Sequence, residues 1–396
     1  MSVPVLWGSR LSPYALKLEA ALQYKGIAYR RLPAQGTHFE NARLMLRLET
    51  AKRLGEVIRY PVVEDAFDEY PLLPYFSYDK RTFEYDSSSI LLRMEAEHEG
   101  HSIVPNDPAH HFLVRFIDHA FNDFGLYLVH HMRWVGSAKS NRMGRRLAAE
   151  FKTALPPGGA WLLSRTFPTR QVKRLPYLMS VAPQGYKAGV KSSLTPPSKR
   201  DFPETHTLLE QSWKAILEAM ELVLAQQNYL FGDRFTLADA SAYGQLGMNL
   251  VDPEAAARMK DIAPQTFHWL ERIQNGQFVE TNRESDAPLQ INSRLDNLLN
   301  VLMGTYGALM VQNERAFIVA EANGQTRFNE TAFDAGEALY IGKLRGYPFR
   351  TVIKAFQVRP WRELKQQWQS LNEADKAIIK QHMQLSELFE STESRK

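Results

Sequence analysis

The stretch WGSRLSPYALKLEAALQYKGIAY, residues 7–29, most constrains the fold, because an apolar strand leads through a Ser-Pro step into an amphipathic helix. Residues 3–7 form a short apolar run, which predicts a buried strand. From Pro13 onward apolar side chains recur at helical spacing, and Gly26 supplies a C-terminal stop. Residues 27–32 predict a second strand. The chain therefore begins with strand, helix and strand.

The pattern continues through the rest of the first hundred residues. A polar helical stretch covers 38–59. Two short apolar runs, 72–77 and 81–85, then predict a hairpin. A further amphipathic stretch predicts a helix over 88–99. This part of the chain thus follows the order strand, helix, strand, helix, strand, strand, helix.

Beyond residue 108 the periodicity is helical. Two long amphipathic helices are predicted, over 112–134 and 207–226. A third begins at Thr236, with Asp239 three residues later. This pair forms a capping box, worth about 0.5–2 kcal/mol, because each side chain satisfies a free backbone N–H of the first turn.

The last parts of the chain are less regular. Residues 165–200 are rich in Pro, Gly and Lys and predict a long loop. A helix is predicted over 289–321, a hairpin about Arg345 and Gly346, and a final helix over 361–369. Because an isolated hairpin is marginal in water, we expect this last segment to pack on the helices before it.

Composition limits the chemistry. The chain has no Cys, which excludes disulfides, thiolate metal sites and cysteine nucleophiles. Five histidines between His110 and His131 match no compact ligand spacing, so we predict no metal site. The sequence shows no signal-peptide pattern, and no apolar run approaches the roughly 18 residues that cross a membrane. We therefore expect a cytoplasmic protein without a membrane partner.

Charge is distributed unevenly. The formal net charge is only +4, yet residues 136–200 hold 13 Lys or Arg against one acid, Glu150. Such a run is usually a solvated face. It could also attract anionic ligands at long range, or nucleic acid without sequence specificity. Since no nucleic-acid-binding motif accompanies it, we expect no specific nucleic-acid partner.

Three stretches, in this order, resemble the cytosolic glutathione transferase family. Residues 7–29 are similar to the family's first strand, catalytic turn and first helix. Residues 72–91, LLPYFSYDKRTFEYDSSSIL, are similar to its third and fourth strands. Residues 230–241, LFGDRFTLADAS, resemble the capping-box helix of its C-terminal domain. The resemblance covers roughly residues 3–275.

The resemblance implies an α/β plus all-α fold with three parts. These are a thioredoxin-like glutathione-binding domain over 1–100, an all-helical domain over 101–285, and an extension over 286–396 packed on the helical domain. The family also implies a homodimer. The interval between the second and third strands is longer than usual in the family, which indicates an insertion within 50–69.

Ser12 is the candidate catalytic residue. Taken alone, it is an ordinary helix N-cap followed by Pro13 at the first helical position. In the family this position belongs to a serine or cysteine that faces the glutathione sulfur. A hydroxyl donor at the positive end of a helix would favour the thiolate over the thiol. Ser9 is the alternative, and Tyr14 is expected to flank the sulfur.

The other candidate residues lie further along the first domain. A cis bond before Pro74 would turn the Leu73 backbone towards the cysteinyl part of glutathione, whereas the simpler interpretation is a proline at a strand edge. Pro61 competes for this role. Asp86 and Ser87 start a helix in either case, and the resemblance implies that they hold the ammonium and carboxylate of the γ-glutamyl end.

We therefore predict a glutathione transferase, with glutathione as co-substrate and a small-molecule electrophile. The bound thiolate would attack an electrophilic carbon in a largely apolar pocket between the two domains. A serine at position 12 cannot form a mixed disulfide, which disfavours thiol-transferase chemistry. Two alternatives stay open: a non-catalytic binding or scaffold protein of this fold, and a glutathione-dependent isomerase or lyase.

Overall fold

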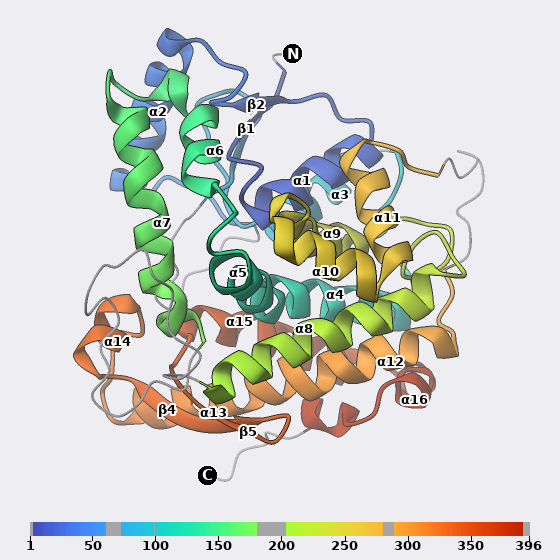
Figure 1. Ribbon diagram of the computed structural model, residues 1–396. Helices are drawn as coiled ribbons and strands as arrows, with labels where there is room; N and C mark the ends of the chain where they lie inside the picture. Colours follow the sequence, from blue (N-terminus) through green and yellow to red (C-terminus); the bar gives the residue numbers. More distant parts are fainter. Residues whose placement is uncertain (1–2, 61–72, 99, 180–202, 280–288, 391–396) are drawn as a thin grey trace.

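The first domain lies at one end of the molecule and the helices of the remaining chain form its body (Figure 1). The structure is a computed structural model that describes residues 3–60, 73–98, 100–179, 203–279 and 289–390. Within these ranges, none of the helices combines the length and apolar content that crossing a membrane requires.

The first domain contains a three-stranded sheet of β1 (Val5–Trp7), β2 (Arg30–Leu32) and β3 (Tyr75–Ser77). The central strand β1 runs parallel to β2 and antiparallel to β3. Glu84 exchanges two backbone hydrogen bonds with Phe76, of 2.9 and 2.8 Å. The predicted hairpin is therefore present, with its second strand reduced to a bridge.

Helices cover both faces of this sheet: α1 (Pro13–Tyr24), α2 (His38–Leu54) and α3 (Ser87–Glu97). Because side chains alternate along a strand, Leu6 packs with α1 and α3, whereas Val5 and Trp7 pack with α2. The helix predicted over 38–59 is too long. It ends earlier because Gly55 takes a left-handed conformation with φ 70°.

The body begins with a continuous helical run of α4 (Pro108–Ala120), η1 (Phe121–Gly125), α5 (Leu126–His131) and η2 (Met132–Gly136). This run confirms the helix predicted over 112–134 and shows two π-helical segments within it. The other helices of the body are α8 (Pro203–Leu224), α9 (Leu237–Gly247), α10 (Pro253–Ile262) and α11 (Pro264–Gln274). The capping box at the start of α9 is confirmed.

A pair of helices between α5 and α8, namely α6 (Met143–Glu150) and α7 (Gly159–Leu178), lies along one side of the molecule (Figure 1). The loop predicted over 165–200 is therefore wrong as far as Leu178, and residues 180–200 lie outside the described ranges. Proline content favoured a loop, but Val172 and Leu175 are buried with Leu11 in a separate apolar cluster. Such tertiary packing supports most helices in proteins.

The last hundred residues pack on α4 and α8. They form α12 (Ser293–Leu302), η5 (Met303–Gly307), α13 (Ala308–Ala322), α14 (Glu330–Ala335), the hairpin of β4 (Leu339–Leu344) and β5 (Tyr347–Val352), α15 (Ala355–Ser370), α16 (Glu373–His382) and η6 (Ser386–Phe389). The hairpin confirms the prediction about Arg345 and Gly346. Trp368 of α15 packs on Phe112 of α4, with 5.4 Å between ring centroids, so this segment shares the main apolar core.

Candidate active site

The turn between β1 and α1 holds two serines with different surroundings. Ser9 is buried, and its Oγ accepts a hydrogen bond of 3.1 Å from the Leu11 N–H. Ser12 is the N-cap of α1, half-buried, yet its side chain makes no capping bond. Among the described residues the Ser12 hydroxyl has no hydrogen-bond partner, and because Ser12 is half-buried whereas Ser9 is buried, Ser12 is the more accessible of the two to a ligand.

The bond between Leu73 and Pro74 is cis, as predicted. The antiparallel pairing of Trp7 with Tyr75 places this bond beside the end of β1. A Cβ atom added to Gly8 would lie 3.2 Å from the Pro74 Cβ, so the two segments are in close contact. The backbone of Leu73 therefore lies next to the turn that carries Ser12. The competing Pro61 lies outside the described residues.

Asp86 caps the start of α3. Asp86 takes a positive φ of 67°, and its side chain accepts a hydrogen bond of 2.9 Å from the Ser89 N–H. Its second oxygen lies 3.7 Å from Nε of the buried Arg59. Ser87 is the first helical residue and is buried. Arg59 was not predicted as part of the site, because nothing in its local sequence links it to Asp86.

Tyr14 faces the body of the molecule. Its hydroxyl donates a hydrogen bond of 2.8 Å to the Asn122 carbonyl. Burial, with the charges of Asp123 and Asp86, holds the pKa of this phenol well above its ordinary value. Because Asn122 Nδ2 also donates a hydrogen bond of 2.9 Å to the Ser88 Oγ, Asn122 links the start of α3 to the start of α1. The predicted contact of Tyr14 with a sulfur stays a prediction.

A buried ion pair joins α1, α3 and α4. Lys17 Nζ lies 2.5 Å from the Asp118 Oδ1 and 2.6 Å from the Ser88 Oγ. Both charged side chains are almost fully excluded from solvent. Burial opposes the charge on Asp118, but the cations Lys17 and Arg115 outweigh it and hold the pKa of Asp118 well below its usual range. This pair fixes the start of α3 against α1 and was not predicted, because it joins residues far apart in the chain.

Asp123 adds a second unpredicted acid, in the π-helical segment η1. Its Oδ2 is buried without a hydrogen-bond partner. Burial raises the pKa of Asp123 to about 8, although the side-chain amide of Gln357 of α15 opposes the shift. The Gln357 Nε2 also donates a hydrogen bond of 3.0 Å to the Tyr127 hydroxyl. The extension therefore reaches the region next to Tyr14, and π-helical segments are frequent at functional sites.

The histidines of the body take structural positions. His131 Nε2 and His206 Nδ1 lie 2.7 Å apart, and His110 Nδ1 lies 2.6 Å from Asp107. Burial lowers the pKa of His130 to about 3. Within the described ranges, no group of three or more His, Asp or Glu is arranged to hold a metal ion.

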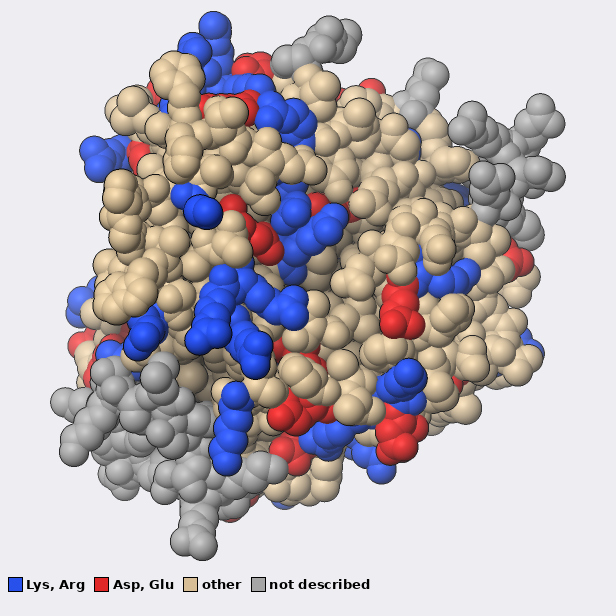
Figure 2. Space-filling view, turned by 45° about the horizontal axis from the view of Figure 1, so that its top comes forward, with Lys and Arg blue, Asp and Glu red and all other residues tan. Residues whose placement is uncertain are grey.

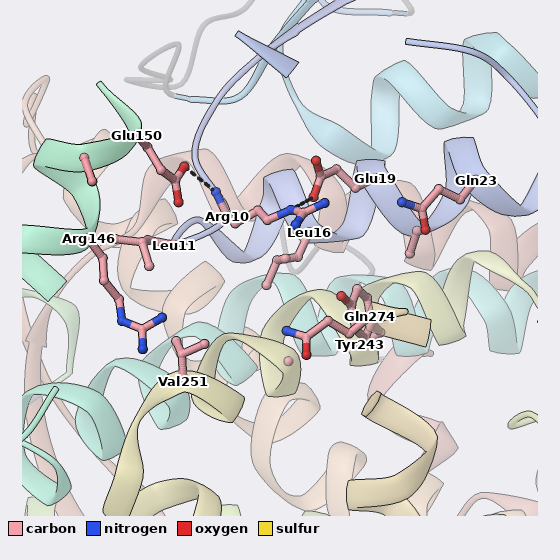
Figure 3. Close-up of a pocket in the computed structure, with 13 residues that line it drawn as sticks. Arg10, Leu11, Leu16, Glu19, Gln23, Arg146, Glu150, Tyr243, Val251 and Gln274 are labelled. Atoms are coloured by element: carbon pink, nitrogen blue, oxygen red, sulfur yellow. Dashed lines mark hydrogen bonds and ion pairs between the residues drawn. The ribbon is translucent and has the colours of Figure 1, made fainter. Parts of the chain in front are cut away.

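A separate cavity of about 370 Å³ lies between α1, α6, α9 and α11 (Figure 3). Arg10 and Leu11 line it, but none of the seven predicted site residues does. On α1 its wall is formed by Leu16, Ala20 and Gln23, a different face from that of Lys17. This cavity is therefore distinct from the candidate site at Ser12.

Exposed arginines lie at helix α6. In Figure 2, a group of Lys and Arg side chains lies near the middle of the face shown, with Asp and Glu side chains at its borders. Helix α6 carries the exposed arginines Arg145 and Arg146, and its N-cap Arg142 is exposed as well. The uneven charge predicted for this part of the chain is thus presented on the surface.

Comparison with known proteins finds a family model that matches part of the helical body. A thioredoxin-like sheet domain followed by a helical domain is the architecture of glutathione transferases. Residues 203–272 match the family model described as glutathione S-transferase, C-terminal domain. This match covers α8, α9, α10 and most of α11. These helices are therefore similar to the C-terminal domain of glutathione S-transferases. No curated protein matches the chain.

Solved structures of glutathione transferases are similar at low identity. One from Phanerochaete chrysosporium is 16% identical, with a TM-score of 0.41, and the match covers 71% of this chain and 100% of that chain. One from Ceriporiopsis subvermispora, in complex with glutathione, is 15% identical, with a TM-score of 0.39 and coverage of 70% and 99%. One from Rhodospirillum rubrum is 14% identical, with a TM-score of 0.38 and coverage of 74% and 99%.

Proposed function

We propose that the protein is a cytoplasmic glutathione transferase, acting as a homodimer on a small electrophile. The observation that carries the proposal is the Ser12 hydroxyl, which has no partner among the described residues and stands at the N-terminus of α1. The cis bond before Pro74 lies beside the same turn, and the start of α3 is joined to α1 through Ser88 and Lys17. A donor, a strand edge and a helix N-terminus are the groups that a thiol peptide with a charged end requires.

In this proposal glutathione lies along the backbone of Leu73. Its cysteinyl N–H and carbonyl pair with that backbone as an added strand would. Its γ-glutamyl carboxylate meets the N–H groups at Ser87, and its ammonium meets Asp86. Lys17 and Asp118 support this end from beneath, because Lys17 holds the neighbouring Ser88.

Ser12 then stabilises the reactive form of the thiol. Its hydroxyl donates to the sulfur, and the positive end of α1 lowers the free energy of the thiolate relative to the thiol. The thiolate attacks an electrophilic carbon, a C–S bond forms, and the leaving group departs with its electron pair. The serine stays unmodified throughout.

Calorimetry and a turnover assay test the proposal. We expect saturable heat on addition of millimolar glutathione, and conjugation of 1-chloro-2,4-dinitrobenzene that can be followed by absorbance. Binding without turnover of any electrophile would favour the scaffold alternative. No heat at millimolar glutathione would overturn the placement of the site.

A further inference from the structure

The cavity between α1 and α6 carries a charge pattern that the proposed reaction does not use. Two acids line it, and both are paired. Glu19 lies 2.9 Å from Nε of Arg10 and 3.1 Å from Nε of Arg31. Glu150 lies 3.2 Å from Nη1 of Arg31 and accepts a hydrogen bond of 3.1 Å from the Arg10 N–H. Neither acid is therefore left to attract a cation.

Arg146 lines the same cavity and has no such partner. It is exposed on α6, and its guanidinium forms no ion pair or hydrogen bond among the described residues. The positive charge of Arg146 acts electrostatically on Asp252. That acid, however, already forms an ion pair with Arg133, with 2.9 Å between Nε and Oδ2. In Figure 3 the Arg146 side chain extends from α6 beside Val251. The guanidinium of Arg146 therefore gives the cavity a positive charge that neither of its two acids neutralises.

The remaining walls are mostly apolar. Leu11, Leu16, Ala20 and Val251 contribute aliphatic surface. Tyr243 contributes a ring and a hydroxyl, and burial beside the charge of Glu19 keeps the pKa of this phenol well above its ordinary value. The hydroxyl therefore stays a neutral hydrogen-bond group. Apolar walls with a few convergent polar groups are typical of small-molecule sites.

We propose that this cavity binds a small aromatic monoanion. Arg146 holds the carboxylate, because a guanidinium presents two parallel N–H donors to its two oxygens. The aromatic body packs on the aliphatic wall and on Tyr243. The volume of about 370 Å³ accommodates two fused rings. The basic surface around α6 attracts the anion at long range.

Calorimetry with 2-naphthoate tests this site on the full-length protein without glutathione. We expect saturable binding, about tenfold weaker binding of the neutral isostere 2-naphthamide, and about tenfold weaker binding of 2-naphthoate to Arg146→Gln. Arg145→Gln is the matched control, because Arg145 is exposed on the same helix and does not line the cavity. It should bind as the unmodified protein does.

A second variant tests whether binding requires the empty volume of the cavity, independently of the charge of Arg146. Ala149 is exposed on α6 and lines the cavity, so Ala149→Trp fills it without disturbing the core. This variant should lose binding of both probes. Ser12→Ala should leave the naphthoate affinity unchanged, which separates this site from the proposed glutathione site. Equal binding of naphthoate and naphthamide, or unchanged binding in Arg146→Gln and Ala149→Trp, would overturn the proposal.

Discussion

The N-termini of α1 and α9 begin with the same kind of residue and use it in opposite ways. At α9 the Asp239 carboxylate accepts hydrogen bonds from the Thr236 N–H, at 2.9 Å, and from its hydroxyl, at 2.8 Å. Both side chains are fully buried. At α1 the Ser12 hydroxyl caps nothing and is half-buried. The Thr236 hydroxyl has a hydrogen-bond partner within the protein and stabilises the fold. The Ser12 hydroxyl has none among the described residues and is available to a ligand.

This contrast predicts a large loss of stability when the box at α9 is broken. Asp239 also accepts a hydrogen bond from the Leu230 N–H, so Asp239→Ala leaves several buried donors unpaired. We expect a loss of about 3 kcal/mol in the free energy of unfolding, measured by urea denaturation. Asp233→Ala, an exposed acid in the same loop, should change it by less than about 0.5 kcal/mol. Equal losses would show that the box is not what stabilises this helix.

The opposite outcome is expected at α1. Ser12→Ala removes no capping bond, so its free energy of unfolding should change by less than about 0.5 kcal/mol. Turnover should fall about tenfold or more, which corresponds to about 1.4 kcal/mol of lost stabilisation of the thiolate and transition state. Ultraviolet titration of bound glutathione should show a raised thiol pKa.

Two further variants sharpen this second test. Thr236→Ala should lower stability by about 1 kcal/mol and leave the thiol pKa of bound glutathione unchanged. Ser12→Cys should form a mixed disulfide with glutathione, because a helix N-terminus lowers a cysteine pKa. Unchanged thiol ionisation in Ser12→Ala together with no mixed disulfide in Ser12→Cys would return the role to Ser9 or Tyr14.

Asp123 extends the comparison to a third polar group, one that is buried and incompletely paired. Its pKa is raised from 3.8 to about 8 by burial. Between these values the folded protein holds a proton that the unfolded chain has lost, so stability falls as pH rises from about 4 to about 8. The slope is at most about 1.4 kcal/mol per pH unit. Asp123→Asn should flatten this dependence, measured by urea denaturation from pH 5 to pH 8.

A control variant shows whether the change in pH dependence is specific to Asp123 or follows from the loss of any carboxylate. Asp107 is an exposed N-cap of α4 whose pKa is lowered, mainly by hydrogen bonds to His110 that outweigh its burial. Asp107→Asn keeps the cap and should leave the slope above pH 5 unchanged. If Asp123→Asn shows the same slope as the unmodified protein, the carboxyl is charged in the folded state.

Local patterns predicted the parts of the fold that depend on neighbours in sequence. The strand before Gly8, the helix after Pro13, the capping box at Thr236 and the hairpin at Gly346 all follow from periodicity or turn chemistry. Helix α7 was missed because its prolines indicate a loop, while its stability comes from burial of Val172 and similar side chains against distant segments.

The candidate site also combines residues that local motifs predicted with residues whose role depends on distant parts of the chain. Ser12, the cis bond before Pro74 and the cap at Asp86 were predicted because each sits in a local motif. Lys17 was not, since a lysine in an amphipathic helix usually faces solvent and its partner Asp118 comes from another domain. The role of each predicted residue towards glutathione is a property of the complex and stays a prediction.

The start of α3 offers the smallest and most selective effect, because Asp86 has two separable tasks. One oxygen caps the helix at Ser89, and the other faces Arg59 and, in the proposed complex, the glutathione ammonium. Asp86→Asn keeps a capping oxygen and tolerates the positive φ, so stability should change by less than about 0.5 kcal/mol. Losing the charge should weaken glutathione binding about fivefold, or about 1 kcal/mol.

Calorimetry at low and high salt measures this effect, and the difference between the two proteins should shrink as salt screens the partly exposed pair of Asp86 and the ammonium. Asp79→Asn is the control, because Asp79 is an exposed acid that holds the turn after β3 and lies outside the candidate site. It should bind glutathione as the unmodified protein does. An unchanged affinity in Asp86→Asn would mean that this acid, like Asp239, serves only its helix, and that the ammonium of glutathione has another partner.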